Sequence, residues 1–388
     1  MKYKVIQRVQ AVQRFLAGEK PEAICVSMCR SRSWLYKWIS RYTNDDDSWC
    51  NNLPTQPRQV ANRTSLEIEE IVKMIRLNLY NQDLFCGAQA IRWELEDLGI
   101  SPLPSLRTIN RILKRNDLTH RRTGKYKPKG TPYPKLPSLL PNQTHQMDMV
   151  GPCYLAGPIR FYGLNMIDTA TARCGLHASL SKSGQEVLDG TWAIWSRLGI
   201  PDNLQVDNAM SFLGSPRYPR ALSQFVRLCL QHDVEPWFVP MAEPWRNGNI
   251  EQFNDHYQQK FLRKVIMTST DELTAGTMTF EQRHNSSYRY SKLGGNTPIK
   301  ALSASKATLR FPNPDNKPKQ RLEKPETGRC HLVRLIRSDL KLNILGELFP
   351  ISPELMLEYV VATIDVKEQK IKLYLGKTQV EEFDYKLR

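Results

Sequence analysis

The chain of 388 residues contains no long hydrophobic run. No stretch of about 18 apolar residues occurs, so a transmembrane helix is not expected. The first residues, MKYKVIQR, lack the apolar segment that defines a secretory signal. These two absences lead us to expect residence in the cytoplasm.

Cysteine is sparse and without pattern. The eight cysteines show no repeating spacing, and only Cys25 and Cys29 lie close together. No His-x-x-x-His motif and no second cysteine pair accompanies them. A zinc site at these two residues is one interpretation, but buried thiols in a reducing compartment fit the spacing better.

Acidic residues are in the minority. There are 39 Asp and Glu against 55 Lys and Arg, which gives a formal net charge of +16. Residues 1–140 hold 24 basic and 13 acidic side chains, residues 141–300 hold 15 and 14, and residues 301–388 hold 16 and 12. The basic excess therefore flanks a nearly neutral centre. This distribution indicates flanking segments that bind nucleic acid, and a merely soluble basic surface is the alternative.

Residues 1–44 are expected to form a helix-turn-helix domain. An apolar stripe runs from Val5 to Leu16, Pro21 begins a second helix, and Ser33 precedes a third. The polar face of the third helix carries Lys37 and Arg41. In this motif the second of two short helices enters the major groove, so these side chains are candidate DNA contacts. A generic three-helix bundle is the alternative.

Residues 64–120 repeat the helical pattern. Ser105 is a plausible N-cap for a helix whose inner side is apolar, which predicts a second helix-turn-helix unit, of the winged type. Two such units can cover a longer DNA site than one. The outer side of this helix carries the candidate DNA-binding residues Arg107, Arg111, Lys114 and Arg115.

Two proline-containing basic segments are expected to be linkers. Residues 121–140 contain no acidic residue, and their prolines prevent a regular helix. Residues 301–328 combine four prolines with interleaved lysines and arginines. The first linker can follow a DNA backbone through Arg121, Arg122, Lys125, Lys127 and Lys129.

Residues 141–300 and 329–388 show different periodicities. The centre reads as three strands followed by alternating helices and strands, which is typical of an α/β core. The C-terminal segment reads as short strands separated by turns, which predicts a small β-barrel. The expected fold is therefore multidomain: N-terminal α-helical helix-turn-helix units, a central α/β core and a C-terminal small β-barrel.

Three acidic residues in the centre have distinctive surroundings. Asp148 lies in an apolar strand-like run, Asp207 follows another, and Glu251 opens an amphipathic helix. Carboxylates that lie close together repel one another unless a cation lies between them, so such a set usually holds a divalent metal ion. A single acid near a strand end is more often a cap or a surface residue, and Asp168 and Asp202 are interpreted in that way.

At these residues the chain resembles a known family. Residues 144–264 look like the ribonuclease-H-like catalytic core of retroviral-type integrases and bacterial insertion-sequence transposases, the DDE recombinases. The most specific matches are the pair Asp207-Asn208 and the run Asn-Gly-x-Ile-Glu-x-Phe-Asn that ends at Asn254.

The resemblance implies a site and a reaction. Asp148, Asp207 and Glu251 would be the catalytic residues and would hold two Mg²⁺ ions about 3.5–4 Å apart, with Mn²⁺ able to substitute. The implied reaction is cleavage of the 3′ ends of a DNA element and strand transfer into target DNA, by a homodimer or higher oligomer in the nucleoid. The residues expected to support the site are Asn208, Gly248 and Asn254.

Two other functions stay open at this stage. The chain could be a domesticated transposase that acts as a DNA-binding regulator, but three intact carboxylates argue against it. It could also be a ribonuclease-H-like nuclease without joining activity, but such an enzyme needs fewer DNA-binding modules. His145, close to Asp148, could assist near the metal ions, although a structural histidine at a strand edge is the simpler interpretation.

Overall fold

The computed structural model describes residues 2–43, 47–52, 64–119, 133–241, 243–318 and 321–388. The chain divides into two compact units, Met1–Ser65 and Leu66–Arg388. Within the described residues, no helix is long and apolar enough to cross a membrane. The eight cysteines are free thiols.

The first unit is a small helical domain with its own core. Its helices are α1 (Lys2–Leu16), α2 (Pro21–Met28) and α3 (Arg32–Ile39), followed by the 3-10 turn η1 (Asp47–Cys50). The third helix begins earlier than expected, because the hydroxyl of Ser31 and not Ser33 caps it by accepting the N–H of Trp34. Ala11, Ile24 and Leu35 are fully buried between the three helices.

The second unit begins with three further helices, α4 (Leu66–Asn81), α5 (Ala88–Asp97) and α6 (Leu106–Arg115). Ser105 caps α6 as expected, since its hydroxyl accepts the N–H of Thr108. Residues 64–119 hold no strand, and residues 120–132, where a wing would follow, lie outside the described residues.

These three helices pack against the rest of the second unit. The ring of Phe85 meets the rings of His256, Tyr288 and Tyr290 edge-on, with centroids 4.9–5.5 Å apart. The guanidinium of Arg289 forms an ion pair with Asp97. The helical unit that the sequence indicates is therefore joined to the core by an aromatic and ionic interface.

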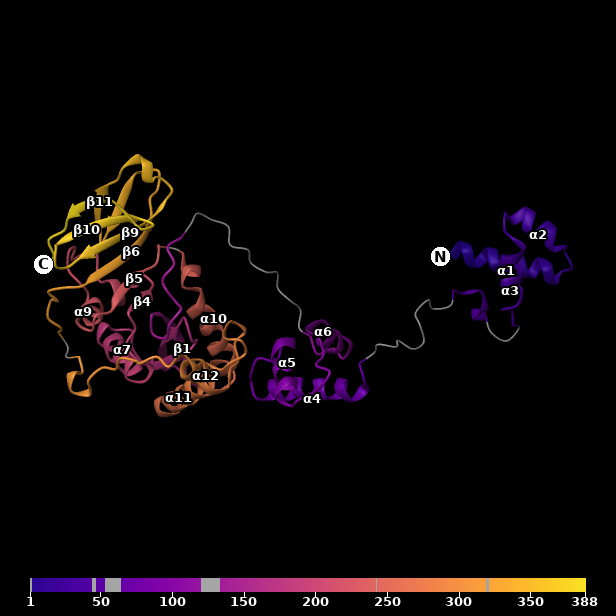
Figure 1. The fold of residues 1–388 in the computed structure, drawn as a ribbon, viewed down its shortest axis with the longest axis horizontal. Helices are drawn as coiled ribbons and strands as arrows, with labels where there is room; N and C mark the ends of the chain where they lie inside the picture. The colour runs from indigo at the N-terminus through magenta and orange to yellow at the C-terminus, as the bar shows by residue number, and fades with distance from the viewer. Residues whose placement is uncertain (1, 44–46, 53–63, 120–132, 242, 319–320) are drawn as a thin grey trace. The chain divides into compact units, whose positions relative to one another are not determined.

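The described strands of the core form one nine-stranded sheet. Several of its strands are labelled in Figure 1. Its strand order is β11-β10-β9-β6-β5-β4-β1-β2-β3. The first five strands along the chain are β1 (Thr144–Tyr154), β2 (Arg160–Asp168), β3 (Cys174–Ser179), β4 (Asn203–Val206) and β5 (Glu235–Phe238). Strands β1, β2 and β3 are antiparallel, whereas β4 and β5 run parallel to β1. The predicted mixed α/β core is thereby confirmed.

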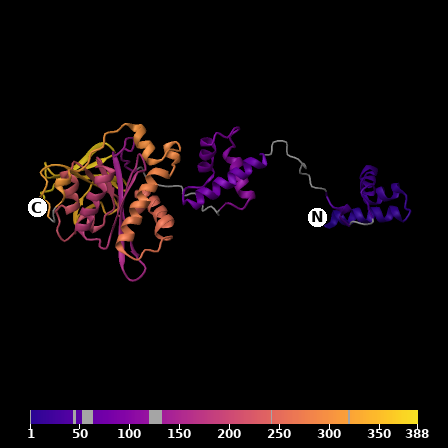
Figure 2. The ribbon, with the colours of Figure 1, turned by 90° about the horizontal axis from the view of Figure 1, so that it is seen from below.

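Helices cover both faces of this sheet (Figure 2). One face packs against α7 (Gly184–Leu198), α8 (Met210–Leu213) and α9 (Gln224–Gln231), with Trp192 and Trp195 buried in that layer. The other face packs against α10 (Gly248–Tyr257), the π turn η3 (Gln258–Leu262) and α11 (Thr270–Ser287). The remaining short elements before the C-terminal strands are η2 (Pro244–Asn247), η4 (Ser291–Leu293), α12 (Pro298–Ser305) and η5 (Pro314–Asn316).

The C-terminal strands extend the core sheet. They are β6 (Arg329–Leu335), β9 (Tyr359–Asp365), β10 (Lys370–Leu375) and β11 (Thr378–Asp384), and they lie beside β5 in Figure 1. Strand β6 runs parallel to β5, with Trp237 opposite His331 and Phe238 opposite Leu332. A separate hairpin pairs β7 (Lys341–Ile344) with β8 (Glu347–Pro350), and the turn η6 (Pro353–Leu355) follows.

The prediction of a C-terminal small β-barrel over 329–388 was wrong. The strands described there do not close on themselves, because β6 is paired with β5 on one side and β9 on the other. Every residue of β9 is buried, which is typical of an interior strand covered on both faces. The predicted strands are present, and the error concerns their partners.

Candidate active site

The sheet register places Asp148 beside Asp207. Gln146 of β1 pairs with Gln205 of β4 in parallel, and each aspartate lies two residues further along its strand direction. Gly151 and Pro152 then interrupt the pairing of β1 with β2, and such bulges occur often next to active sites. Local strand geometry therefore brings two of the three predicted carboxylates to adjacent positions.

Glu251 reaches the same region on α10, whose first turn is fastened to both strands. The Gln146 side chain accepts the N–H groups of Asn249 and Ile250 at 3.0 and 3.1 Å. Asn247 donates to the carbonyl of Met147 at 3.2 Å, and Gln205 donates to the carbonyl of Arg246 at 2.9 Å. Two strand amides next to the aspartates thus set where the helix begins.

Asn254 joins the helix to Asp148. Its Nδ2 donates to Asp148 Oδ2 at 2.9 Å, and its Oδ1 accepts from Asn165 of β2 at 2.8 Å. The other oxygen, Asp148 Oδ1, accepts the N–H of Met149 at 2.8 Å. These donors orient the carboxylate, and each oxygen keeps a second lone pair for another ligand.

The pKa of Asp148 is raised from 3.8 to about 6. Burial is the main cause, and the negative charges of Asp207 and Glu251 raise it further. The pKa of Glu251 is also raised, by burial and by Asp255. Repulsion among carboxylates in a half-buried site is what a bound cation would relieve.

The candidate metal ligands of this site are carboxylate oxygens. Carboxylate oxygens are the hard ligands that Mg²⁺ prefers. No three His, Cys, Asp or Glu side chains converge into a ready-made cage anywhere in the described part of the chain. Asp148 and Asp207 line one pocket of about 560 Å³, and Glu251 of α10 is not among its lining residues. The ligand chemistry of the two aspartates fits a divalent ion, and Glu251 would be the third ligand.

The structure shows the surroundings of Asn208 and Gly248, two of the predicted supporting residues. Both ends of the Asn208 amide are engaged, because Nδ2 donates to the Val239 carbonyl at 2.6 Å and Oδ1 accepts from Arg334 at 3.0 Å. Gly248 has an ordinary helical backbone, and an added Cβ would meet nothing within 4 Å. His145 is fully buried, and burial lowers its pKa to about 4, so it is a structural histidine.

The predicted DNA-binding residues fall into three groups. Lys37, Arg107, Arg111 and Lys114 are exposed on α3 and α6, and Arg41 stacks on Trp38 at 5.1 Å. Arg115 is also exposed on α6, and it forms a two-point ion pair with the buried Glu69. The linker residues Arg121, Arg122, Lys125, Lys127 and Lys129 lie outside the described residues.

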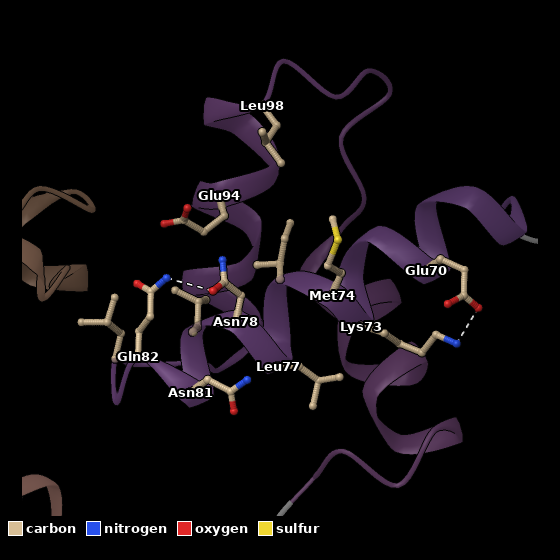
Figure 3. Close-up of a pocket in the computed structure, with 12 residues that line it drawn as sticks. Glu70, Lys73, Met74, Leu77, Asn78, Asn81, Gln82, Glu94 and Leu98 are labelled. Carbon is tan, nitrogen blue, oxygen red and sulfur yellow. Dashed lines mark hydrogen bonds and ion pairs between the residues drawn. The ribbon is translucent and has the colours of Figure 1, made fainter.

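Two shallow pockets lie on the α4–α6 helices. One of about 570 Å³ is lined by Arg107, Asn110, Lys114 and Thr119, and its charge suits a phosphate group. The other, of about 1070 Å³, lies on α4 and α5 and includes the Glu70–Lys73 ion pair (Figure 3). None of the three predicted carboxylates lines it, so its size does not make it the chemical site.

The sequence interpretation missed several residues of this site. Gln146, Asn165 and Gln205 hold the carboxylate-bearing elements together, and Lys182 lines the same pocket as Asp148. A signal was present, because amide side chains inside apolar strands must find hydrogen-bond partners when buried. Lys182, in an exposed turn before α7, carried no such signal.

Comparison with known proteins gives matches for two parts of the chain. Residues 2–48 match the model of a homeodomain-like domain. The HTLV-2 integrase catalytic core domain in complex with magnesium, in its dimeric form, is 19% identical, with a TM-score of 0.33 over 43% of this chain and 99% of that chain. Its trimeric form gives 18% identity and a TM-score of 0.34 over the same shares.

A larger assembly also aligns with the chain. The simian T-cell lymphotropic virus intasome in complex with PP2A regulatory subunit B56 gamma is 13% identical, with a TM-score of 0.38 over 82% of this chain and 97% of that chain. No curated protein sequence matches. The matched model shows a homeodomain-like domain at residues 2–48, and the observed strand order shows a central mixed sheet of parallel and antiparallel strands.

Proposed function

We propose that this protein is a DNA transposase of the DDE type, which binds the ends of a DNA element and joins them to target DNA. The observation that carries the proposal is the placement of Asp148 and Asp207 in one pocket at the ends of adjacent strands, with Glu251 near enough on α10 for both negative charges to add to burial in raising the pKa of Asp148. The exposed basic residues of α3 and α6 support a DNA substrate.

The proposed chemistry needs no side-chain nucleophile. In the first step a water oxygen attacks a phosphorus atom at the element end, the P–O3′ bond breaks, and a free 3′-OH is left. In the second step that 3′ oxygen attacks a target phosphodiester in line, and the target's own 3′ oxygen leaves. Bound Mg²⁺ would supply activation of the attacking oxygen and stabilisation of the leaving one. Each step exchanges one P–O bond for another, so no ATP is required.

In this scheme the residues of the chain hold the metal ions and orient the reacting groups. Asp148 and Asp207 would hold the cations from adjacent strands, and Glu251 would complete the ligand set from α10. Asn254 keeps Asp148 turned toward the site through its hydrogen bond. Lys182 lines the same pocket, where its charge suits a DNA phosphate. Holding the reacting groups in one geometry supplies much of the catalysis in such enzymes.

The test is a strand-transfer assay with Asp207→Asn. We expect Mg²⁺-dependent joining to fall by roughly a hundredfold or more, because a ligand for the catalytic charge is lost, while folding and DNA binding stay intact. Asp202→Asn is the matched control, since Asp202 is exposed and its ion pair with Arg310 lies on the surface. Joining by Asp207→Asn near the wild-type rate would refute the proposal. Cleavage without any joining by the wild type would favour the nuclease instead.

A further inference from the structure

The C-terminal strands contact both segments that carry the carboxylates of β4 and α10. We propose that these strands position the active site: Arg334 of β6 fixes the turn after Asp207, and Tyr359 of β9 fixes the segment that leads into Glu251. Neither residue would touch DNA or a metal ion, so both are positioning residues. The inference rests on the proposed function, because positioning matters only if those carboxylates act.

Arg334 pins the turn that follows β4. Its guanidinium donates to Asn208 Oδ1 at 3.0 Å and to the carbonyl of Val239 at 3.4 Å. Asn208 donates in turn to the same Val239 carbonyl at 2.6 Å. Asp207 is the adjacent residue, and its Oδ1 accepts the N–H of Ala209 at 3.0 Å. The direction of the Asp207 carboxylate therefore depends on a turn that Arg334 holds closed.

Burial of the Arg334 guanidinium at this position is unfavourable for the stability of the fold. It is only 8% exposed, it makes no ion pair among the described residues, and its Nε finds no hydrogen-bond partner among them. Burial lowers its pKa from 12.5 to about 10. A buried charge without a partner of opposite sign destabilises a fold, and an apolar side chain of the same size would be cheaper. Fold stability therefore does not explain this arginine, whereas positioning of Asn208 does.

Tyr359 anchors the segment before α10. Its hydroxyl donates to Glu243 Oε1 at 2.7 Å and accepts from Arg246 at 3.0 Å. Arg246 also donates to Glu243 Oε2 at 2.8 Å and lies over the rings of Tyr359 and Tyr133, at 4.9 and 4.1 Å. Since Arg246 belongs to the turn η2 that runs directly into α10, this cluster fixes the helix one turn ahead of Glu251.

The experiment compares two variants of the full chain with two matched controls. Arg334→Met keeps the length of the side chain and removes its donors, and Tyr359→Phe removes one hydroxyl. The controls are Arg329→Met, at an exposed arginine of the same strand that pairs with the buried Asp365, and Tyr374→Phe, on the neighbouring strand β10. The readouts are Mn²⁺ binding by calorimetry without DNA, single-turnover joining, and DNA affinity.

We expect Arg334→Met to weaken Mn²⁺ binding about tenfold or more, since residues that orient ligands have effects of this size. Joining should slow in parallel while DNA affinity stays unchanged. Tyr359→Phe should show the same pattern more weakly, and both controls should stay within about twofold of wild type. Arg334→Lys should recover part of the Mn²⁺ affinity, because an ammonium group can still donate to Asn208.

The proposal is overturned if Arg334→Met binds Mn²⁺ as tightly as Arg329→Met while Asp207→Asn loses binding. If Arg334→Met does not fold, the Mn²⁺ affinity of Tyr359→Phe is compared with that of Tyr374→Phe, and equal affinities overturn the proposal. Retained joining by Asp207→Asn would instead refute the proposed function itself. A loss of DNA affinity with Mn²⁺ binding intact would also overturn the proposal, since it would make the C-terminal strands a DNA-binding element.

Discussion

Asp148 carries a charge that the fold does not stabilise by itself. Its pKa in the folded protein is about 6, against an ordinary value of 3.8, chiefly because of burial. A carboxyl group whose pKa is raised by folding binds its proton more tightly in the native state. Its contribution to stability is therefore present in full below about pH 4 and is lost as the pH rises through about 6.

This pH dependence of stability gives a prediction for Asp148→Asn in the absence of metal. At pH 4 the variant and the wild type should have similar free energies of unfolding, because the carboxyl is then largely protonated. At pH 7 the variant should be more stable by about 1–3 kcal/mol, because it avoids burying the charge. Denaturant titration with a chelator at both pH values measures this difference. A pH-independent difference for Asp148→Asn would contradict the assignment.

At the scale of residues, local sequence indicated the carboxylates and the supporting residues Asn208 and Asn254, but not Arg334 or which partner each side chain binds. Asp148, Asp207 and Glu251 stand out because their neighbours along the chain indicate a strand, a strand end and a helix. Their partners lie far away: Asn254 follows Asp148 by 106 residues, and Arg334 follows Asn208 by 126. Nothing local distinguishes Arg334 from the other arginines, since its burial is decided by the pairing of distant strands.

Among the elements, α11 is fixed to the sheet by one buried acid. Glu281 is 6% exposed, and its carboxylate accepts the N–H of Leu176 at 2.7 Å and two donors of Arg197 at 2.9 and 3.0 Å. Glu281→Ala leaves the arginine and a strand N–H without this acceptor. We expect the free energy of unfolding to fall by about 3 kcal/mol. Gln282→Ala, at an exposed neighbour, should change it little, and equal effects for the two variants would contradict this account.

Helix α6 presents its basic residues outward, which predicts that they read DNA. Arg107→Ala and Arg111→Ala should each weaken binding of the element end by roughly tenfold or more, as loss of an arginine contact does. A residue that touches a base should lose discrimination between sequences, whereas one that touches phosphate should lower the salt dependence by about one. Lys73→Ala on α4, whose ammonium is paired with Glu70, is the control. Unchanged affinity in both arginine variants would remove α6 from the DNA interface.

The elements themselves were largely predictable, whereas their partners were not. Strands and helices from β1 to α10 follow the order that their periodicity indicated, because each buries an apolar face, except that the short helix α8 was not predicted. Helix α11 was missed, although Ser269 and Glu272 form a capping signal at its start. The prediction of a barrel was wrong because the periodicity of a strand indicates which of its faces is buried, and does not indicate which strands it pairs with. The segment Tyr359–Asp365 lacks the alternation of apolar and polar residues that a half-exposed strand has, and this pattern was a signal for an interior strand.

On the scale of the whole molecule, the exposed residues of α3 and the carboxylates belong to different compact units. One active site can process one DNA end, and two ends must reach the same target. We therefore predict at least a dimer on DNA, in which a protomer binds one end while its core acts on the other. Mixing two inactive proteins tests this: Glu251→Gln, and a second with Arg107 and Arg111 replaced by alanine.

Recovered joining in the mixture would support action in trans, since only a mixed complex has both an intact core and intact end binding. Each protein assayed alone at the same total concentration is the control. Mixed complexes that form yet stay inactive would show that each protomer cuts the end it binds. Size measurement of the DNA complex separates that outcome from a failure to assemble.

The parallel pairing of β6 with β5 also determines when, during translation, the edge of the sheet at β5 can be covered. About ninety residues separate Phe238 from Arg329, so β5 remains an unpaired sheet edge while the ribosome makes them. Pairing across such a distance is slow, and an open edge invites aggregation in the meantime. Arg334 and Tyr359 emerge after that interval, so the turn after Asp207 and the start of α10 gain their anchors only once β6 and β9 have been made. A nascent chain that has not yet made these two strands consequently lacks the contacts that hold the segments next to Asp207 and Glu251.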